Sequence, residues 1–250
     1  KEVTMNNYLG STKLLTSPAS SYKTAKGIAR GYANYISYMK PYKTIVNGVE
    51  RNVCSMAKTC IKPCLVSAGR GAFNSVKEAR KKRTLYYWED RKAFLEQMEK
   101  EINTGIKWAE RKKLVPVFRL NGTSDLPFHR MGILQKFPSY QFYDYTKVYN
   151  RTTQKLPDNY HLTFSYDGTN LQQCITALNN GINVAMVFRD KLPTSYVLRD
   201  KKGRFVNGYK HIKVIDGDKH DLRFLDESPV IVGLSAKGEA KKDDSVFIID

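Results

Sequence analysis

Short apolar runs alternate with longer amphipathic segments over the second half of the chain. Each run is rich in Val, Ile, Phe and Tyr, which is typical of strands buried in a sheet. The runs that predict strands cover residues 114–121, 140–146, 160–166, 182–189, 211–216 and 229–235. With one further strand near the cysteines, they alternate with helices at intervals of about 20–30 residues, which predicts βαβ units and a parallel sheet. We therefore expect an α/β protein with a partial or open, TIM-like β/α barrel.

Apolar positions that recur every three to four residues predict the helices. The first helix is expected over residues 24–39, and the second over residues 74–114 with a break near residues 103–105. A third is expected over residues 170–180, where Cys174 falls on the apolar face. We therefore interpret Cys174 as a core residue.

The chain is expected to have three parts. Residues 1–52 form an N-terminal helical extension rich in basic and aromatic residues, which includes an Asn-Gly turn. Residues 53–240 form a single α/β domain, and residues 241–250 form a tail. No run of about 18 apolar residues is present, and the first residues lack the apolar segment of a secretory signal. We expect a cytoplasmic protein that does not bind membranes.

The charge balance is strongly basic, with 42 Lys and Arg against 24 Asp and Glu, a formal net charge of +18. Such a charge attracts polyanions, so nucleic acid or an acidic host protein is an expected partner. The expected helix that starts near residue 74 carries a basic run in its first turns, formed by Lys77, Arg80, Lys81, Lys82 and Arg83. This run is interpreted either as a solvated face or as a site for an anionic ligand.

Three of the four cysteines lie on one short loop, at Cys54, Cys60 and Cys64, with the spacing C-x5-C-x3-C. Thiolate is a soft ligand that iron and zinc both accept. An iron–sulfur cube held by three cysteines keeps its fourth iron open to a further ligand. An odd number of cysteines disfavours disulfide pairing. The loop therefore predicts a metal site, with a [4Fe–4S] cluster as the first hypothesis.

Zinc is the main alternative cofactor for the same three cysteines. A structural zinc site needs four ligands, so one more side chain would have to join them. The candidates for that fourth ligand are Cys174, His129, His161, His211 and His220. A further interpretation is that the three cysteines are unrelated residues of the protein core.

Polar side chains stand at the ends of five predicted strands. They are Arg119, Asn121, Ser124, Asp125, Asp144, Tyr145, Thr146, Lys147, Ser165, Asp167, Arg189, Asp190, Ser235 and Lys237. Parallel α/β folds gather functional groups at the carboxyl ends of their strands. We expect an anionic or amino-acid-like ligand, or a cofactor, to be bound by Arg119, Asn121, Ser124, Asp125, Tyr145, Lys147 and Lys237. No catalytic residue is assigned, and no glycine-rich dinucleotide or P-loop motif is present.

These motifs together resemble a phage family named after gene product eighty-eight. The resemblance rests on the cysteine loop with Ala-Gly-Arg-Gly, on Arg-x-Asn-Gly-Thr-Ser-Asp and on Tyr-Thr-Lys, and it covers about residues 47–237. The positions that correspond to the family's motifs are Cys54, Cys60, Cys64, Arg119, Gly122, Asp125, Tyr145, Thr146 and Lys147. The resemblance implies a phage-encoded protein of the host cytoplasm.

The layout is similar, more distantly, to that of radical S-adenosylmethionine enzymes. Those enzymes place three cysteines on the loop after the first barrel strand, with the spacing C-x3-C-x2-C, whereas this chain has C-x5-C-x3-C. The similarity implies S-adenosylmethionine as a second cofactor. The resulting hypotheses are an iron–sulfur enzyme with an open iron, and a nucleic-acid-binding protein with a structural or redox-sensing cluster or zinc.

Overall fold

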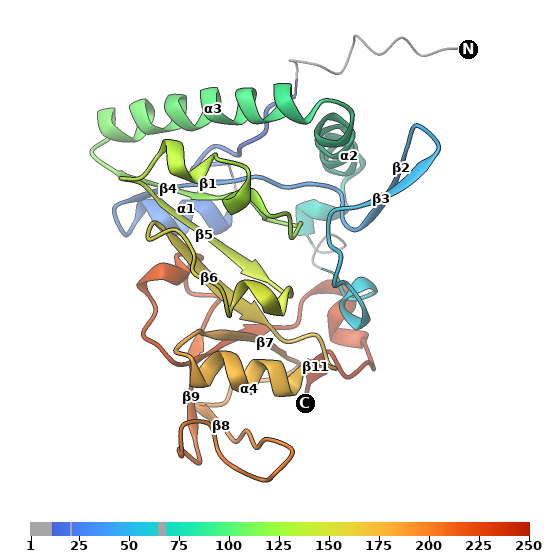
Figure 1. Ribbon diagram of the computed structural model, residues 1–250, viewed down its shortest axis with the longest axis vertical. Helices are drawn as coiled ribbons and strands as arrows, with labels where there is room; N and C mark the ends of the chain where they lie inside the picture. The colour runs from blue at the N-terminus through green and yellow to red at the C-terminus, as the bar shows by residue number, and fades with distance from the viewer. Residues whose placement is uncertain (1–11, 21, 65–68) are drawn as a thin grey trace. The chain divides into compact units, whose positions relative to one another are not determined.

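The computed structural model describes residues 12–20, 22–64 and 69–250, which form a mixed α/β fold (Figure 1). The strands of the main sheet are β1 (Tyr32–Ile36), β4 (Val115–Arg119), β5 (Gln141–Thr146), β6 (Tyr160–Ser165), β7 (Val184–Phe188), β8 (Ser195–Tyr196), β9 (Ile212–Asp216), β10 (Ile231–Ser235) and β11 (Ile248–Ile249). Among the described residues the sheet has nine strands, in the order β1-β4-β5-β6-β7-β10-β9-β8, with β11 beside β7. Strand β8 is antiparallel to β9, whereas β10 is parallel to both of its neighbours.

The predicted α/β class and the largely parallel sheet are confirmed, but a barrel is not. In the part of the chain that the structure describes, the sheet is open and ends at β1 and β8. Apolar runs predict that strands exist and are buried, but they carry no information on whether the two edge strands meet. That property depends on the twist and stagger of the whole sheet.

The helices are α1 (Tyr22–Ile28), α2 (Asn74–Glu89), α3 (Arg91–Arg111) and α4 (Leu171–Asn179). Short 3-10 helices cover Thr59–Ile61 (η2), Gly69–Ala72 (η4), Phe128–Arg130 (η5), Leu134–Lys136 (η6), Tyr149–Arg151 (η7), Arg223–Leu225 (η8) and Gly238–Lys242 (η9). Strands β2 (Lys43–Val46) and β3 (Val49–Asn52) form a separate hairpin with the predicted Asn-Gly turn. Within the described residues, no helix combines the length and the apolar character needed to cross a lipid bilayer.

Two predicted helices have different bounds in the structure. The predicted helix 24–39 is wrong beyond Ile28, because the chain turns at Gly31 with φ +84° and then forms β1, paired with β4. The predicted helix 74–114 breaks at Asp90 instead of residues 103–105. The Asp90 side chain accepts a hydrogen bond from Ala93 N at 2.9 Å, so it caps the start of α3.

The chain divides into two compact units. Unit 1 comprises Lys1–Ser55 and Arg70–Phe142, and unit 2 comprises Met56–Gly69 and Tyr143–Asp250. In unit 1, α1 packs against β1, and α3 packs against β1 and β4. Phe94, Met98 and Ile102 of α3 are completely buried there.

Unit 2 has its core between α4 and the neighbouring strands. Cys174 and Leu178 of α4 are completely buried together with Val184 of β7 and Ile231 of β10. The prediction that Cys174 is a core residue is therefore confirmed. Burial raises the pKa of its thiol well above the usual value, because the thiolate is poorly solvated there.

Candidate functional site

The first cysteine of the loop is held within unit 1. Cys54 is half-buried, and its backbone N donates to Asn52 Oδ1 at 2.7 Å. The preceding carbonyl, that of Val53, accepts from Asp125 N at 2.7 Å. Asp125 follows β4, so this bond ties the start of the cysteine loop to the end of a sheet strand.

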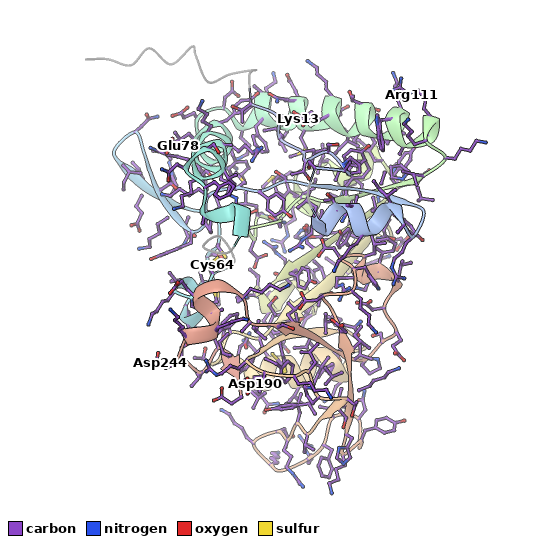
Figure 2. All side chains as sticks on the ribbon, turned by 180° about the vertical axis from the view of Figure 1, so that it is seen from behind. Lys13, Cys64, Glu78, Arg111, Asp190 and Asp244 are labelled. Carbon is purple, nitrogen blue, oxygen red and sulfur yellow. The ribbon has the colours of Figure 1, made fainter. Side chains whose placement is uncertain are left out.

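The other two cysteines of the loop belong to unit 2. Cys60 lies in η2, where the hydroxyl of Thr59 donates to the carbonyl oxygen of Asp167. Asp167 follows β6, so η2 lies at the carboxyl end of that strand. Cys64, labelled in Figure 2, donates from its backbone N to Ile61 O at 3.4 Å. Cys60 and Cys64 are both half-buried.

The loop fits a soft metal by its donor chemistry. Three half-buried thiols occur within eleven consecutive residues, and thiolate is the preferred ligand of iron–sulfur clusters. Among the residues that the structure describes, no three His, Cys, Asp or Glu side chains are gathered closely enough to hold a metal ion. The fit therefore rests on the type and spacing of the thiols, whose final approach would accompany metal binding.

At the end of β4, two predicted ligand-binding residues organise the loop itself. Asn121 Oδ1 accepts from Ser124 Oγ and from Leu126 N, both at 2.8 Å, and Asn121 Nδ2 donates to Leu126 O at 3.0 Å. Arg119 and Asp125 are 6% exposed. The four predicted residues that follow or end β4, Arg119, Asn121, Ser124 and Asp125, are thus buried in unit 1. The side-chain amide of Asn121 is hydrogen-bonded to the backbone of Leu126.

Gly122 lies between these residues and approaches the end of β1 very closely. Its N donates to Ser37 O at 2.8 Å. A Cβ at this position would lie 2.6 Å from both Ile36 Cγ2 and Ser37 O. The glycine of the Arg-x-x-Gly-x-x-Asp pattern is therefore explained by backbone packing between two neighbouring strands.

In unit 2, the strand-end lysines have partners within the protein. Lys147 Nζ lies 5.7 Å from the ring centroid of Phe247, and Tyr145 beside it is half-buried. Lys237 Nζ forms an ion pair with Asp218, whose other carboxylate oxygen accepts from Ser235 N at 3.0 Å. The structure thus joins Lys237 to the turn after β9.

Other strand-end residues stabilise local structure. Asp167 Oδ1 accepts from Thr169 N at 2.8 Å and from Asn170 N at 3.0 Å, which fixes the turn before α4. The guanidinium of Arg189 donates to Lys241 O and Asp243 O at 2.9 and 2.8 Å, and it forms an ion pair with Asp250. Arg189 thereby holds the C-terminal segment beside β7.

Sequence reasoning missed a buried charged cluster around Arg223 in unit 2. Arg223 is completely buried, and its Nη1 lies 3.3 Å from Asp226 Oδ2. Its Nη2 donates to His220 O at 2.5 Å, and Tyr143 OH donates to Asp221 Oδ2 at 3.0 Å. The only sequence signal was the five charged residues among positions 219–227, a density that also suits an exposed loop.

Burial shifts two pKa values in this cluster. Burial, assisted by the positive charge of Arg223, lowers the pKa of His161 to about 4. Burial raises the pKa of Asp226 to about 6, although Arg223 acts in the opposite direction. His161 is therefore neutral at physiological pH and does not act as a cation toward Asp221 or Asp226.

The fold and the loop define an α/β protein with three half-buried cysteines on one short segment. A model of the family described as Gene product 88 matches residues 10–250. The chain belongs to this family, which confirms the predicted resemblance to the phage family.

No curated protein and no solved structure matches the chain. The more distant similarity to radical S-adenosylmethionine enzymes has no support among the matches and stays a prediction.

Proposed function

We propose that this protein binds a [4Fe–4S] cluster through Cys54, Cys60 and Cys64. The main support is the set of three half-buried thiols within eleven consecutive residues. Beside Cys60, the hydroxyl of Thr59 donates to the carbonyl oxygen of Asp167, which follows β6. Parallel α/β folds bind their ligands at the carboxyl ends of their strands. When bound, a cube with three cysteine ligands supplies one iron that accepts an external ligand.

The fourth cysteine is a poor candidate for the remaining coordination position. Cys174 lies on the buried face of α4, where burial disfavours its thiolate. Its thiol also donates a weak hydrogen bond to Asn170 Oδ1, at 3.6 Å, near the start of α4. The proposal therefore keeps three protein ligands and gives Cys174 a packing role.

Replacing any one of the three loop cysteines by serine is expected to abolish most cluster binding. The wild type, purified without oxygen, should contain about four iron atoms and four sulfides per chain and absorb visible light broadly. Cys54→Ser, Cys60→Ser and Cys64→Ser should each lose most of the iron and the absorbance. Iron and acid-labile sulfide analysis measures the effect.

The matched control is Cys174→Ala, which should keep the iron and sulfide content of the wild type. Stoichiometric zinc in a colourless wild type would contradict the cluster and support the zinc alternative. A folded wild type that holds neither metal would reject both.

A second candidate function, nucleic-acid binding, is favoured by the uneven distribution of charge. Unit 1 carries 24 Lys and Arg against 10 Asp and Glu, a net +14, whereas unit 2 carries 18 against 14, a net +4. In the basic run of α2, Lys77, Lys81 and Lys82 are exposed. A concentrated positive field of this kind attracts phosphate backbones.

Two arginines of the same run have structural roles. Arg83 donates to Lys13 O at 2.7 Å and to Tyr38 O at 3.1 Å. Arg80 stacks over the Tyr38 ring, with Cζ 5.5 Å from its centroid. A variant that changes these arginines would therefore disturb the fold as well as the charge, so the test is restricted to the three lysines.

The triple variant Lys77→Gln, Lys81→Gln and Lys82→Gln is expected to bind a short DNA duplex more weakly than the wild type. Loss of three phosphate contacts should reduce the slope of log affinity against log salt by about 3. The matched control is the triple variant Lys92→Gln, Lys100→Gln and Lys107→Gln, which removes three exposed charges from α3. Its net charge equals that of the α2 triple variant. Equal weakening by both triple variants would contradict a site on α2.

A further inference from the structure

A basic loop over residues 199–210 projects from unit 2, between β8 and β9. Leu198, just before it, and Val206, within it, are 3% and 0% exposed and belong to the core around α4. Isolated bridges join Arg199 to Phe205 and Val206 to Tyr209. The loop is therefore anchored in the core at two points and is a folded element.

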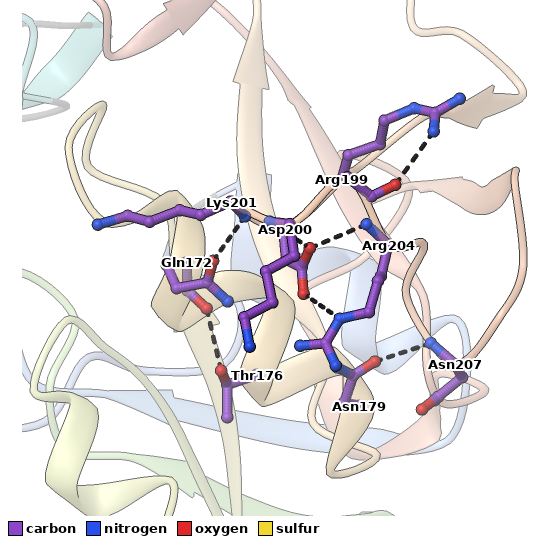
Figure 3. A network of polar contacts seen from close by, with 10 residues as sticks. Gln172, Thr176, Asn179, Arg199, Asp200, Lys201, Arg204 and Asn207 are labelled. Carbon is purple, nitrogen blue, oxygen red and sulfur yellow. Dashed lines mark hydrogen bonds and ion pairs between the residues drawn. The ribbon is translucent and has the colours of Figure 1, made fainter.

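The carboxylate of Asp200 organises the tip of this loop. It accepts from Lys202 N at 2.8 Å, from Arg204 N at 2.9 Å and from Arg204 Nε at 2.8 Å (Figure 3). The hydrogen bond from Arg204 N is the main reason why the pKa of Asp200 lies below its usual value. Arg204 thus forms an ion pair with Asp200, while its side chain stays 72% exposed.

Two side chains of α4 hold the backbone of the loop. Gln172 Oε1 accepts from Lys201 N at 3.3 Å, and Asn179 Oδ1 accepts from Asn207 N at 2.8 Å (Figure 3). These residues are seven positions apart, so they lie on the same face of the helix. The bonds fix the loop on both sides of its tip, which lowers the conformational entropy that a ligand would otherwise have to remove.

The loop presents three lysines and one aromatic ring to solvent. Lys201, Lys202 and Lys210 are exposed, and Tyr209 is 66% exposed. Arg199 is exposed as well, and its Cζ lies 4.0 Å from the centroid of the Phe205 ring. Asp200 is the only acidic residue between positions 199 and 210. The solvent-facing part of the loop therefore combines positive charge with a ring available for stacking.

We propose that the loop over residues 199–210 binds single-stranded nucleic acid. Lys201, Lys202 and Lys210 contact phosphates, and the ring of Tyr209 stacks on an unpaired base. Stacking of this kind requires a base face that a duplex buries between its neighbours, so the single strand is the favoured form. This inference rests on the second proposed function, nucleic-acid binding, and adds to it the form of the ligand and a contact in unit 2.

The test measures binding of a fluorescent oligothymidylate of about twelve nucleotides to the full chain by anisotropy, beside a duplex of equal length. Tyr209→Ala should weaken binding of the single strand on the order of tenfold, whereas Tyr209→Phe keeps the ring and should bind within about twofold of the wild type. Lys201→Gln, Lys202→Gln and Lys210→Gln together should reduce the salt slope by about 2. The α3 triple variant described above has the same net charge and should keep the slope of the wild type.

Each outcome decides the proposal. Equal single-strand affinity of Tyr209→Ala and the wild type overturns it, since no stacking contact would then exist. Equal weakening of duplex and single strand by Tyr209→Ala also overturns it. If the wild type binds the duplex but not oligothymidylate, the inference fails while nucleic-acid binding stands, and if it binds neither at low salt, both fail. Thermal melting of each variant, expected to match that of the wild type, excludes misfolding as the cause.

Discussion

Gly122→Ala is expected to destabilise the protein by about 2–4 kcal/mol, which is a large effect for one added methyl group. The new Cβ would lie 2.6 Å from Ser37 O, a backbone atom that cannot move without disturbing the pairing of β1 with β4. The hydrogen bond from Gly122 N to Ser37 O would lengthen at the same time. Urea denaturation of the wild type and the variant measures the loss.

Gly132→Ala is the matched control for the cost of changing a glycine. Gly132 has φ +77°, and nothing lies within 4 Å of an added Cβ. The expected loss there is about 1 kcal/mol, from backbone strain alone. Equal losses from both variants would contradict a steric role for Gly122.

Arg223→Met is expected to cost about 3–5 kcal/mol, because it leaves the buried carboxyl of Asp226 without its cation and removes the hydrogen bond from Arg223 to His220 O. Arg223 is completely buried, and the side chain of Asp226 is 3% exposed. The double variant Arg223→Met with Asp226→Leu should recover most of the loss, since an apolar pair needs no compensation. Urea denaturation of the two single variants and the double variant gives the coupling energy.

The pH dependence of the Arg223→Met variant distinguishes lost charge pairing from lost packing. Arg223 lowers the pKa of Asp226, so its removal raises that pKa further above about 6. The folded variant then binds a proton more tightly than the unfolded chain, and its stability falls as pH rises through the folded pKa. The loss relative to the wild type should therefore be smaller at pH 5 than at pH 7.5. A loss that is independent of pH would indicate packing alone.

The candidate site was only partly predictable from the sequence. The cysteine spacing, the strand-end positions and the family motifs could be identified, because thiols and strand boundaries have local signatures. The structural use of Asn121, Asp167 and Arg189 could not, since each bonds to backbone groups that the sequence does not bring together. The buried cluster around Arg223 could not be predicted for the same reason, because Tyr143 and Asp221, which share a hydrogen bond, are far apart in the chain.

The sequence by itself determined the α/β class, the strands β4, β5, β6, β7, β9 and β10 that follow from apolar runs, the Asn-Gly hairpin turn and the core position of Cys174. These depend on periodicity and turn preference within a few residues. Only the tertiary structure decided that residues 32–36 form a strand, that the long helix breaks at Asp90 and that the sheet of the described residues is open. Each of these is set by pairing or capping between particular partners, which competes with local preference and overrides it.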